Sequence, residues 1–253
     1  MQIQLPMSRR CVAYFTLTAP PGTSEHTLFV SGGTALAESV TPLQEKALVK
    51  FLTDRAEFRH LIADVLGLGR SVCWLREKGP PLAAPRGEKP GDIDLLIAPS
   101  GSPHLARALE FKRVLVRQND DLSERLNKVE GVADAFSQAA GLARLGYHEA
   151  YMALLVVSDL RRHPSENAIF TDASWDTIQR ILDVPDWSEL ASAVGLVWVE
   201  ICQATDEPID RSGRVSLCVL KPPTRLEQSG ARSSLVARLF DDQCECGHHD
   251  AYA

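Results

Sequence analysis

Two strand-like segments separated by a short polar connection constrain the fold of this chain more than any other feature. Residues 92–99 read DIDLLIAP and residues 107–117 read RALEFKRVLVR, with the stretch SGSPH between them. Both segments are rich in apolar and β-branched residues that favour strands, whereas Ser, Gly and Pro are typical of turns. We therefore predict an antiparallel hairpin that brings Asp94 and Glu110 onto neighbouring strands.

The elements around this hairpin predict the fold class. Apolar residues recur at helical spacing over residues 41–67 and again over residues 120–145. Residues 70–76 resemble a strand, and residues 79–91 hold four prolines and three glycines, which predicts a loop. Residues 150–160 form a continuous apolar run, typical of a strand buried on both faces. The order of helix, three strands, helix and strand predicts an α/β fold with a mixed sheet flanked by helices.

We divide the chain into three parts. Residues 1–40 form an N-terminal extension whose strand-like segments, residues 11–18 and 27–31, suggest a hairpin. Residues 41–221 form one domain, and residues 222–253 form a polar C-terminal tail. After residue 164 we expect, in order, a helix at 175–182, a short helix at 187–193, and strands at 195–204 and 215–221.

The hairpin carries residues suited to metal-dependent chemistry. Because side chains alternate along a strand, Asp92 and Asp94 share one face, Glu110 and Lys112 share one face, and Phe111 points toward a core. Two neighbouring carboxylates repel each other unless a cation lies between them, and such oxygen ligands suit Mg²⁺. A bound Mg²⁺ polarises a phosphoryl oxygen and activates a water molecule, which Lys112 is placed to orient or deprotonate.

The stretch GDIDLLI followed by LEFKR resembles the core of the PD-(D/E)xK superfamily of restriction-endonuclease-like phosphodiesterases. That core consists of a helix, three antiparallel strands, a second helix and a further strand. The resemblance implies that Asp94 and Glu110 bind Mg²⁺ or Mn²⁺ and that Lys112 is the catalytic lysine. It also implies that Asp92 assists or is an alternative ligand, and that Gln138 on the second helix joins the site.

The same resemblance implies an activity and partners. We expect an endo- or exonuclease that hydrolyses phosphodiester bonds of nucleic acid, with DNA as the substrate, in restriction, repair or anti-phage defence. An acidic residue of the first helix is expected to join the site, and Glu45 and Glu57 are both candidates. Two kinds of protein partner are compatible with this expectation, a second copy of the chain in a homo-oligomer and partner proteins of a defence system. Two alternatives are a catalytically inactive member of the fold that acts as a nucleic-acid-binding or assembly module, and a structural protein whose hairpin is only a charged surface.

Charge limits how the chain contacts nucleic acid. A net charge of -6 argues against a protein that coats nucleic acid non-specifically, although a local basic groove is compatible with it. Arg113 and Arg117 flank the proposed site and are candidates for contacts to phosphates. A solvated charged face explains these two arginines equally well.

The cysteines and the lack of a long apolar run indicate a compartment. Six cysteines, mostly far apart in apolar segments, fit a reducing environment, and no apolar run approaches the roughly 18 residues of a membrane span. We therefore expect a cytoplasmic protein without a membrane segment. Near the C-terminus, Cys244, Cys246, His248 and His249 are capable zinc ligands. Their spacing is tighter than in structural zinc sites, so we interpret this segment as a polar tail.

Overall fold

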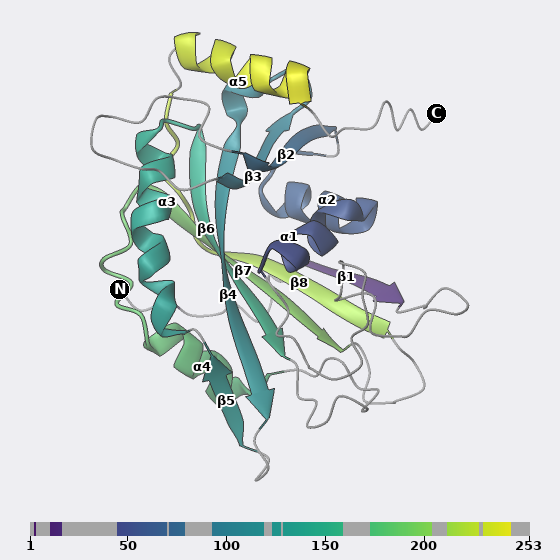
Figure 1. Ribbon diagram of the computed structural model, residues 1–253, viewed down its shortest axis with the longest axis vertical. Coiled ribbons are helices and arrows are strands. Elements are labelled where there is room, and N and C mark those ends of the chain that lie inside the picture. Colours follow the sequence, from purple (N-terminus) through teal and green to yellow (C-terminus); the bar gives the residue numbers. More distant parts are fainter. Residues whose placement is uncertain are drawn as a thin grey trace, which may run out of the picture.

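A computed structural model describes residue 3 and the ranges 11–16, 45–69, 71–78, 93–118, 123–127, 129–158, 173–203, 212–227 and 230–243. Within these ranges, eight strands form one mixed sheet with helices on both faces (Figure 1). The predicted α/β class and mixed sheet are confirmed. No helix among the described residues is long and apolar enough to cross a membrane.

Three parallel strands form the middle of the sheet. They are β4 (Arg107–Gln118), β6 (Glu149–Ser158) and β7 (Val194–Gln203). The other strands are β1 (Cys11–Thr16), β2 (Val72–Lys78), β3 (Ile93–Pro99), β5 (Glu124–Asn127) and β8 (Ser212–Lys221). The strand order is β1-β8-β7-β6-β4-β3-β2, with β5 paired to β4 outside this row. Every residue of β6 is buried, so the prediction of a strand covered on both faces is confirmed.

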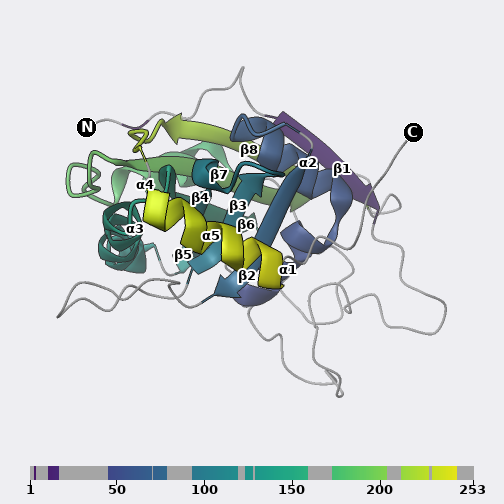
Figure 2. The ribbon, with the colours of Figure 1, turned by 90° about the horizontal axis from the view of Figure 1, so that it is seen from above.

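The helices form two layers and an end cap. One face of the sheet is covered by α1 (Glu45–Asp54) and α2 (Ala56–Val65), and the other by α3 (Asp134–Arg144) and α4 (Trp175–Asp183) (Figure 1). A further helix, α5 (Gly230–Gln243), contacts β2 and the short 3-10 helix η2 (Pro103–Leu105) at one end of the sheet (Figure 2).

Each face of the sheet has its own apolar core. The cluster that we call the α1-side core joins residues of α1 and α2 to the sheet, and includes Leu52, Phe58, Leu95 and Phe111. The α3-side core joins residues of α3, α4 and α5 to the opposite face, and includes Val114, Phe136, Trp198 and Phe240.

The predicted hairpin is present. Strands β3 and β4 pair antiparallel, with Leu95 opposite Leu109 and Ile97 opposite Arg107. Gly101 adopts a φ of 74° in the connection, a left-handed conformation that glycine accepts without strain. Strand β2 pairs antiparallel with β3. The order α1, α2, β2, β3, β4, β5, α3 and β6 follows the predicted order, except for a second short helix at the start and the added strand β5.

The first predicted helix is two helices. Arg55 adopts an extended conformation (φ -102°, ψ 129°) between α1 and α2. The sequence carries a sign of this break, because no large apolar residue occurs between Leu52 and Phe58, where a continuous helix would need one for its buried stripe. The Arg55 guanidinium instead covers the rings of Phe51 and Phe58 at 5.2 and 5.9 Å from their centroids. Residues 41–44, at the start of the predicted helix, lie outside the described residues.

The second predicted helix is wrong in its first part. Residues 124–127 form β5, which extends the hairpin from β4, with Leu115 opposite Asn127 and Gln118 opposite Glu124. Leu122, Leu126 and Val129 show spacing compatible with a helix, but backbone pairing with β4 decides the conformation of this segment. The helix itself begins only at Asp134.

Three differences concern the flanking parts of the chain. Residues 187–193 contain turns instead of a helix, because buried Trp187 folds back after Pro185 and its Nε1 donates to the Leu182 carbonyl at 2.5 Å. Residues 230–243 of the expected tail form α5, which places Val236 and Phe240 in the α3-side core. Strand β1 pairs with β8, and the second segment of the expected N-terminal hairpin lies outside the described residues.

Candidate active site

Strand β4 loses its neighbour β3 just before the Glu110–Lys112 triplet. The β3–β4 pairing ends at Leu95 and Leu109, one residue before Asp94 and Glu110 would face each other. On its other side, β4 stays paired with β6 through Val116. Pairing with β5 begins only at Leu115. Among the described residues, no strand therefore pairs with this edge of β4 between Glu110 and Val114.

Two carboxylates accept the hydrogen bonds that a strand would otherwise receive at this edge. The backbone N–H of Phe111 donates to Asp94 Oδ2 at 2.7 Å, and that of Arg113 donates to Glu45 Oε2 at 2.6 Å. Residues two apart on a strand present their N–H groups to the same side, so both bonds lie along one edge of β4. Hydrogen bonds to an ionised carboxylate are shorter and stronger than neutral ones. Asp94 and Glu45 thus hold β4 where β3 leaves it.

The Asp94 side chain turns toward β4 because β3 is irregular at this residue. Ile93 belongs to the α3-side core and Leu95 to the α1-side core, although residues two apart share a face in a regular strand. Asp94 lies at this change of face and is only partly buried. Its carboxylate reaches the backbone between Glu110 and Lys112.

Glu110 and Lys112 lie on the α3-side face of β4. Their neighbours on that face, Ala108 and Val114, belong to the α3-side core. Glu110 is only 7% exposed, and Lys112 is half-buried. The Lys112 Cε lies 3.6 Å from where a Cβ would stand on Gly131, so the lysine extends toward the 3-10 helix η3 (Glu130–Val132) that precedes α3.

Phe111 points the other way into the α1-side core, as predicted, and is 1% exposed. The structure therefore brings Asp94 to the backbone of the triplet and places Glu110 and Lys112 on one face. The convergence of the three side chains around one ion stays a prediction.

The structure distinguishes the two acidic candidates of the first predicted helix. Glu45 in the first turn of α1 accepts the Arg113 N–H, two residues from the Asp94 contact. Glu57 lies on α2, is largely exposed, and approaches Arg55 at 3.8 Å. The sequence cannot separate them, because the choice depends on how the two short helices are placed against the sheet.

The other predicted site residues have different surroundings. Gln138 is exposed on α3, whereas Ala135, Phe136 and Ala139 are the buried residues of the same helix segment. This position lends no support to a catalytic role for Gln138. Asp92, the loop at residues 79–91 and the cysteine- and histidine-containing C-terminal segment lie outside the described residues.

Arg113 and Arg117 extend from β4 on the side opposite Glu110 and Lys112, because they occupy alternate positions of the strand. Arg113 is 5% exposed, and its buried Nε and Nη1 atoms have no hydrogen-bond partner among the described residues. Burial lowers the pKa of Arg113, the charge of Glu45 raises it, and the charge of Arg117 lowers it. Contacts of these arginines to phosphates stay a prediction.

The donor set at the β3–β4 separation suits a hard cation. Among the described residues, no three His, Cys, Asp or Glu side chains form a group that could hold a metal ion. Mg²⁺ does not need three such side chains, since it keeps several water ligands and is often bound through one or two carboxylates and substrate phosphates. Asp94 and Glu110 on adjacent strands fit that smaller requirement.

Comparisons with known proteins do not place the chain in a family. No family model matches it, and no curated protein matches its sequence.

Proposed function

We propose that this chain is a Mg²⁺-dependent nuclease of the PD-(D/E)xK type, with a restriction-endonuclease-like fold, that cleaves nucleic acid and specifically DNA. The observation that carries the proposal is the contact of the Asp94 carboxylate with the Phe111 N–H, where β3 and β4 separate. It brings the aspartate of one strand to the Glu110–Lys112 triplet of the next. The order of the α1–α2 helices, the antiparallel strands β2, β3 and β4, helix α3 and parallel strand β6, with only β5 added, supports the same proposal.

The carboxylates have complementary roles in this proposal. The hydrogen bond at Oδ2 orients Asp94, and a carboxylate has about four acceptor sites, which leaves capacity for a cation. Glu110 is largely removed from water, where an ionised carboxylate is costly unless hydrogen bonds or a cation compensate its charge. Glu45 is kept at the same edge by the Arg113 N–H and supplies further negative charge.

Lys112 provides the remaining group. Lys112 is half-buried and lies on the same face of β4 as Glu110. In this proposal its ammonium orients the attacking water and stabilises charge on the phosphate. A bound Mg²⁺ would polarise the phosphoryl oxygen and lower the pKa of the attacking water.

The test is cleavage of plasmid, linear and single-stranded DNA with Mg²⁺, Mn²⁺ or chelator. Lys112→Ala should abolish cleavage and leave the fold and most of the Mn²⁺ affinity intact, because the lysine acts on water and phosphate. Lys221→Ala is the matched control. It removes a partly buried lysine of β8, whose Nζ donates to the Ala191 carbonyl away from the proposed site.

The expected result is metal-dependent cleavage by the wild type and by Lys221→Ala, with none by Lys112→Ala. Full activity in Lys112→Ala contradicts the assigned role. Absence of cleavage in the wild type, combined with DNA binding, would instead favour the inactive binding module.

A further inference from the structure

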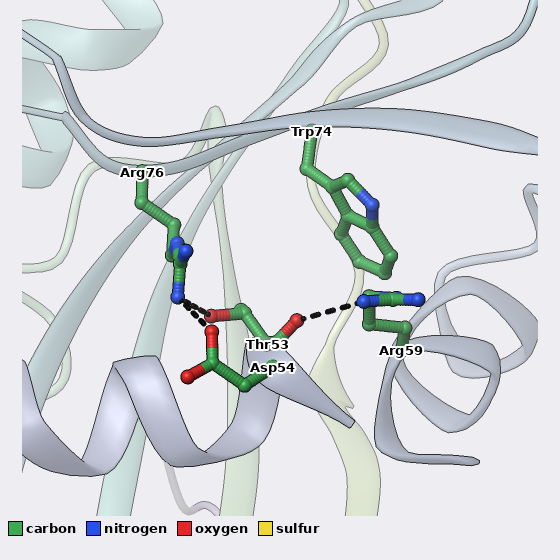
Figure 3. A pocket seen from close by; sticks show the side chains of 5 residues that line it. All are labelled: Thr53, Asp54, Arg59, Trp74 and Arg76. Carbon is green, nitrogen blue, oxygen red and sulfur yellow. Dashed lines mark hydrogen bonds and ion pairs between the residues drawn. The ribbon is translucent and has the colours of Figure 1, made fainter. Parts of the chain in front are cut away.

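A small pocket lies between the α1-side helices and the edge strand β2, apart from the β3–β4 separation. It is lined by Thr53 and Asp54 at the end of α1, Arg59 on α2, and Trp74 and Arg76 on β2 (Figure 3). Its volume is about 190 Å³. Pockets that enclose drug-sized ligands measure about 300–1,000 Å³, so this pocket suits a small chemical group.

Two guanidinium groups approach the pocket floor from opposite walls. Arg76 Nη1 donates to Thr53 Oγ1 at 3.2 Å and also to Asp54 Oδ1. Arg59 Nη1 donates to the Thr53 carbonyl at 3.3 Å, and its Cζ lies 5.3 Å from the centroid of the Trp74 ring. In Figure 3 the two arginines come from different elements and both point toward Thr53 and Asp54. These contacts position both groups before any ligand arrives.

Positive charge exceeds negative charge around this pocket. Lys50 Nζ lies 2.6 Å from Asp54 Oδ2, so Lys50 and Arg76 share one carboxylate. Arg59 has no carboxylate partner in the part of the chain that the structure describes. In the contacts that join described residues here, three cations, Lys50, Arg59 and Arg76, meet one carboxylate, which gives an excess of two positive charges among these four side chains.

Asp54 is itself ionised at neutral pH. Burial favours its neutral form, but hydrogen bonds from Lys50 and Arg76 outweigh burial and lower the pKa of Asp54. The Asp54 carboxylate therefore carries the negative charge that Lys50 and Arg76 share.

The guanidinium chemistry identifies the class of ligand. A guanidinium presents five N–H donors in a planar fork that fits the oxygens of a phosphate in a bidentate manner. Two such groups beside a twofold positive excess match a phosphoryl group better than a singly charged carboxylate. The ordinary alternative is a set of surface ion pairs at the end of α1, each of which contributes about 0–1 kcal/mol to the free energy of unfolding. That alternative explains the contacts of Lys50 and Arg76 with Asp54. It leaves Arg59 without a carboxylate partner among the described residues.

We infer that this pocket binds a phosphoryl group. We further assign this group to a backbone phosphate of the nucleic acid, away from the phosphate that is cleaved. This assignment rests on the proposed nuclease function. Helix α1 connects the two sites, with Glu45 at its first residue and Asp54 at its last. At 1.5 Å per residue these positions are about 14 Å apart along the helix.

The first experiment measures phosphate binding by thermal denaturation in inorganic phosphate, against sodium chloride of equal ionic strength. Arg59→Gln removes the unbalanced guanidinium, and Arg55→Gln is the matched control. Arg55 lies four residues earlier, over the Phe51 ring and near Glu57, and does not line the pocket. Arg59→Lys keeps the charge without the fork and guards against a variant that fails to fold.

Phosphate should stabilise the wild type and Arg55→Gln more than chloride does. Its apparent dissociation constant should rise about tenfold in Arg59→Gln, the effect of losing one charge-assisted hydrogen bond, and less in Arg59→Lys. No excess stabilisation of the wild type by phosphate overturns the inference. Equal losses in Arg59→Gln and Arg55→Gln overturn it as well, because they indicate a general effect of charge.

The second experiment identifies the source of the phosphoryl group. Fluorescence anisotropy of a labelled DNA oligonucleotide is measured in EDTA, so that binding is observed without cleavage. Arg59→Gln should weaken oligonucleotide binding and reduce the slope of its salt dependence by about one. If Arg59→Gln weakens phosphate binding but leaves oligonucleotide binding unchanged, the pocket serves a small phosphorylated molecule and the nucleic-acid assignment is wrong. Oligonucleotide binding that depends on Arg59, without any metal-dependent cleavage, would refute the proposed nuclease and leave the pocket standing.

Discussion

Glu149 binds two arginines of very different exposure, and replacing it should reveal how much the buried one depends on it. Its Oε2 lies 2.5 Å from Arg107 Nε and accepts a hydrogen bond from the Tyr151 hydroxyl at 2.8 Å. Its Oε1 lies 2.9 Å from Arg225 Nε. The side chains of Arg107 and Glu149 are 7% and 3% exposed, whereas that of Arg225 is 76% exposed. The perturbation is Glu149→Gln, with Arg225→Gln as the comparison.

The two replacements should differ severalfold in their effect on the free energy of unfolding. Removing one partner of a buried ion pair costs about 3–5 kcal/mol, because the other charge stays buried without compensation. Glu149→Gln should cost about 3 kcal/mol, near the lower limit, since the amide oxygen still accepts a hydrogen bond. Arg225→Gln should cost about 0–1 kcal/mol, because water screens an exposed pair. With a urea dependence of about 1–3 kcal/mol per molar, the Glu149→Gln midpoint should fall by about 1–3 M.

Urea unfolding followed by tryptophan fluorescence and by circular dichroism at neutral pH measures both values. The two probes must give coincident transitions and the variants must share one slope, since only then does the midpoint report stability. Losses in Glu149→Gln and Arg225→Gln that agree within about 1 kcal/mol would refute the assignment of the buried pair as the dominant interaction.

Three further predictions concern Glu149 on β6, Gly195 on β7 and Asp94 on β3. Burial raises the pKa of Glu149, but the hydrogen bonds from Tyr151, Arg107 and Arg225 and the charge of Arg107 outweigh burial and hold this pKa below its usual range. Its stabilising effect is therefore present above the unfolded-state pKa and lost as the pH falls through the folded-state pKa. The wild type should accordingly lose unfolding free energy more steeply than Glu149→Gln as the pH falls below about 4.5, and parallel curves would contradict this. Gly195→Ala places a Cβ 2.6 Å from Tyr151 Cδ1, and thermal denaturation should show a loss of about 1–3 kcal/mol, with unchanged stability as the opposing result. Asp94→Ala removes the acceptor of the Phe111 N–H and should cost about 1–3 kcal/mol, whereas Asp94→Asn keeps an acceptor and should cost less. Calorimetry should show weaker Mn²⁺ binding in both Asp94 variants, and unchanged binding would mean that Asp94 is not a ligand.

The sequence predicted those parts of the fold whose signal is local. The hairpin of β3 and β4 is encoded in two apolar segments and a connection rich in Ser, Gly and Pro, and β6 in one continuous apolar run. Strand β5 could not be predicted in this way, because its conformation depends on backbone pairing with β4 and its leucines also fit a helix. The burial of α5 depends similarly on contacts with η2 and β2, far away in the sequence.

In the candidate site too, the sequence predicts what depends on local alternation and not what depends on contacts between distant elements. Alternation along β4 is enough to place Glu110 and Lys112 on one face and Phe111 on the other. The hydrogen bond from Phe111 to Asp94 requires the irregularity of β3, for which the sequence offers no signal. The phosphoryl pocket was not predicted, because Arg59 and Arg76 meet only after α2 and β2 have been placed against each other.

The two backbone bonds at the edge of β4 have a consequence for amide hydrogen exchange. Elsewhere in a sheet, an amide is protected by a neighbouring strand and exchanges when that strand separates. The amides of Phe111 and Arg113 are instead protected by the carboxylates of Asp94 and Glu45. Their exchange rates should therefore respond to cation binding at those carboxylates at constant pH, while amides paired with β6 keep their rates. These two amides provide a reporter of the site that needs neither substrate nor turnover.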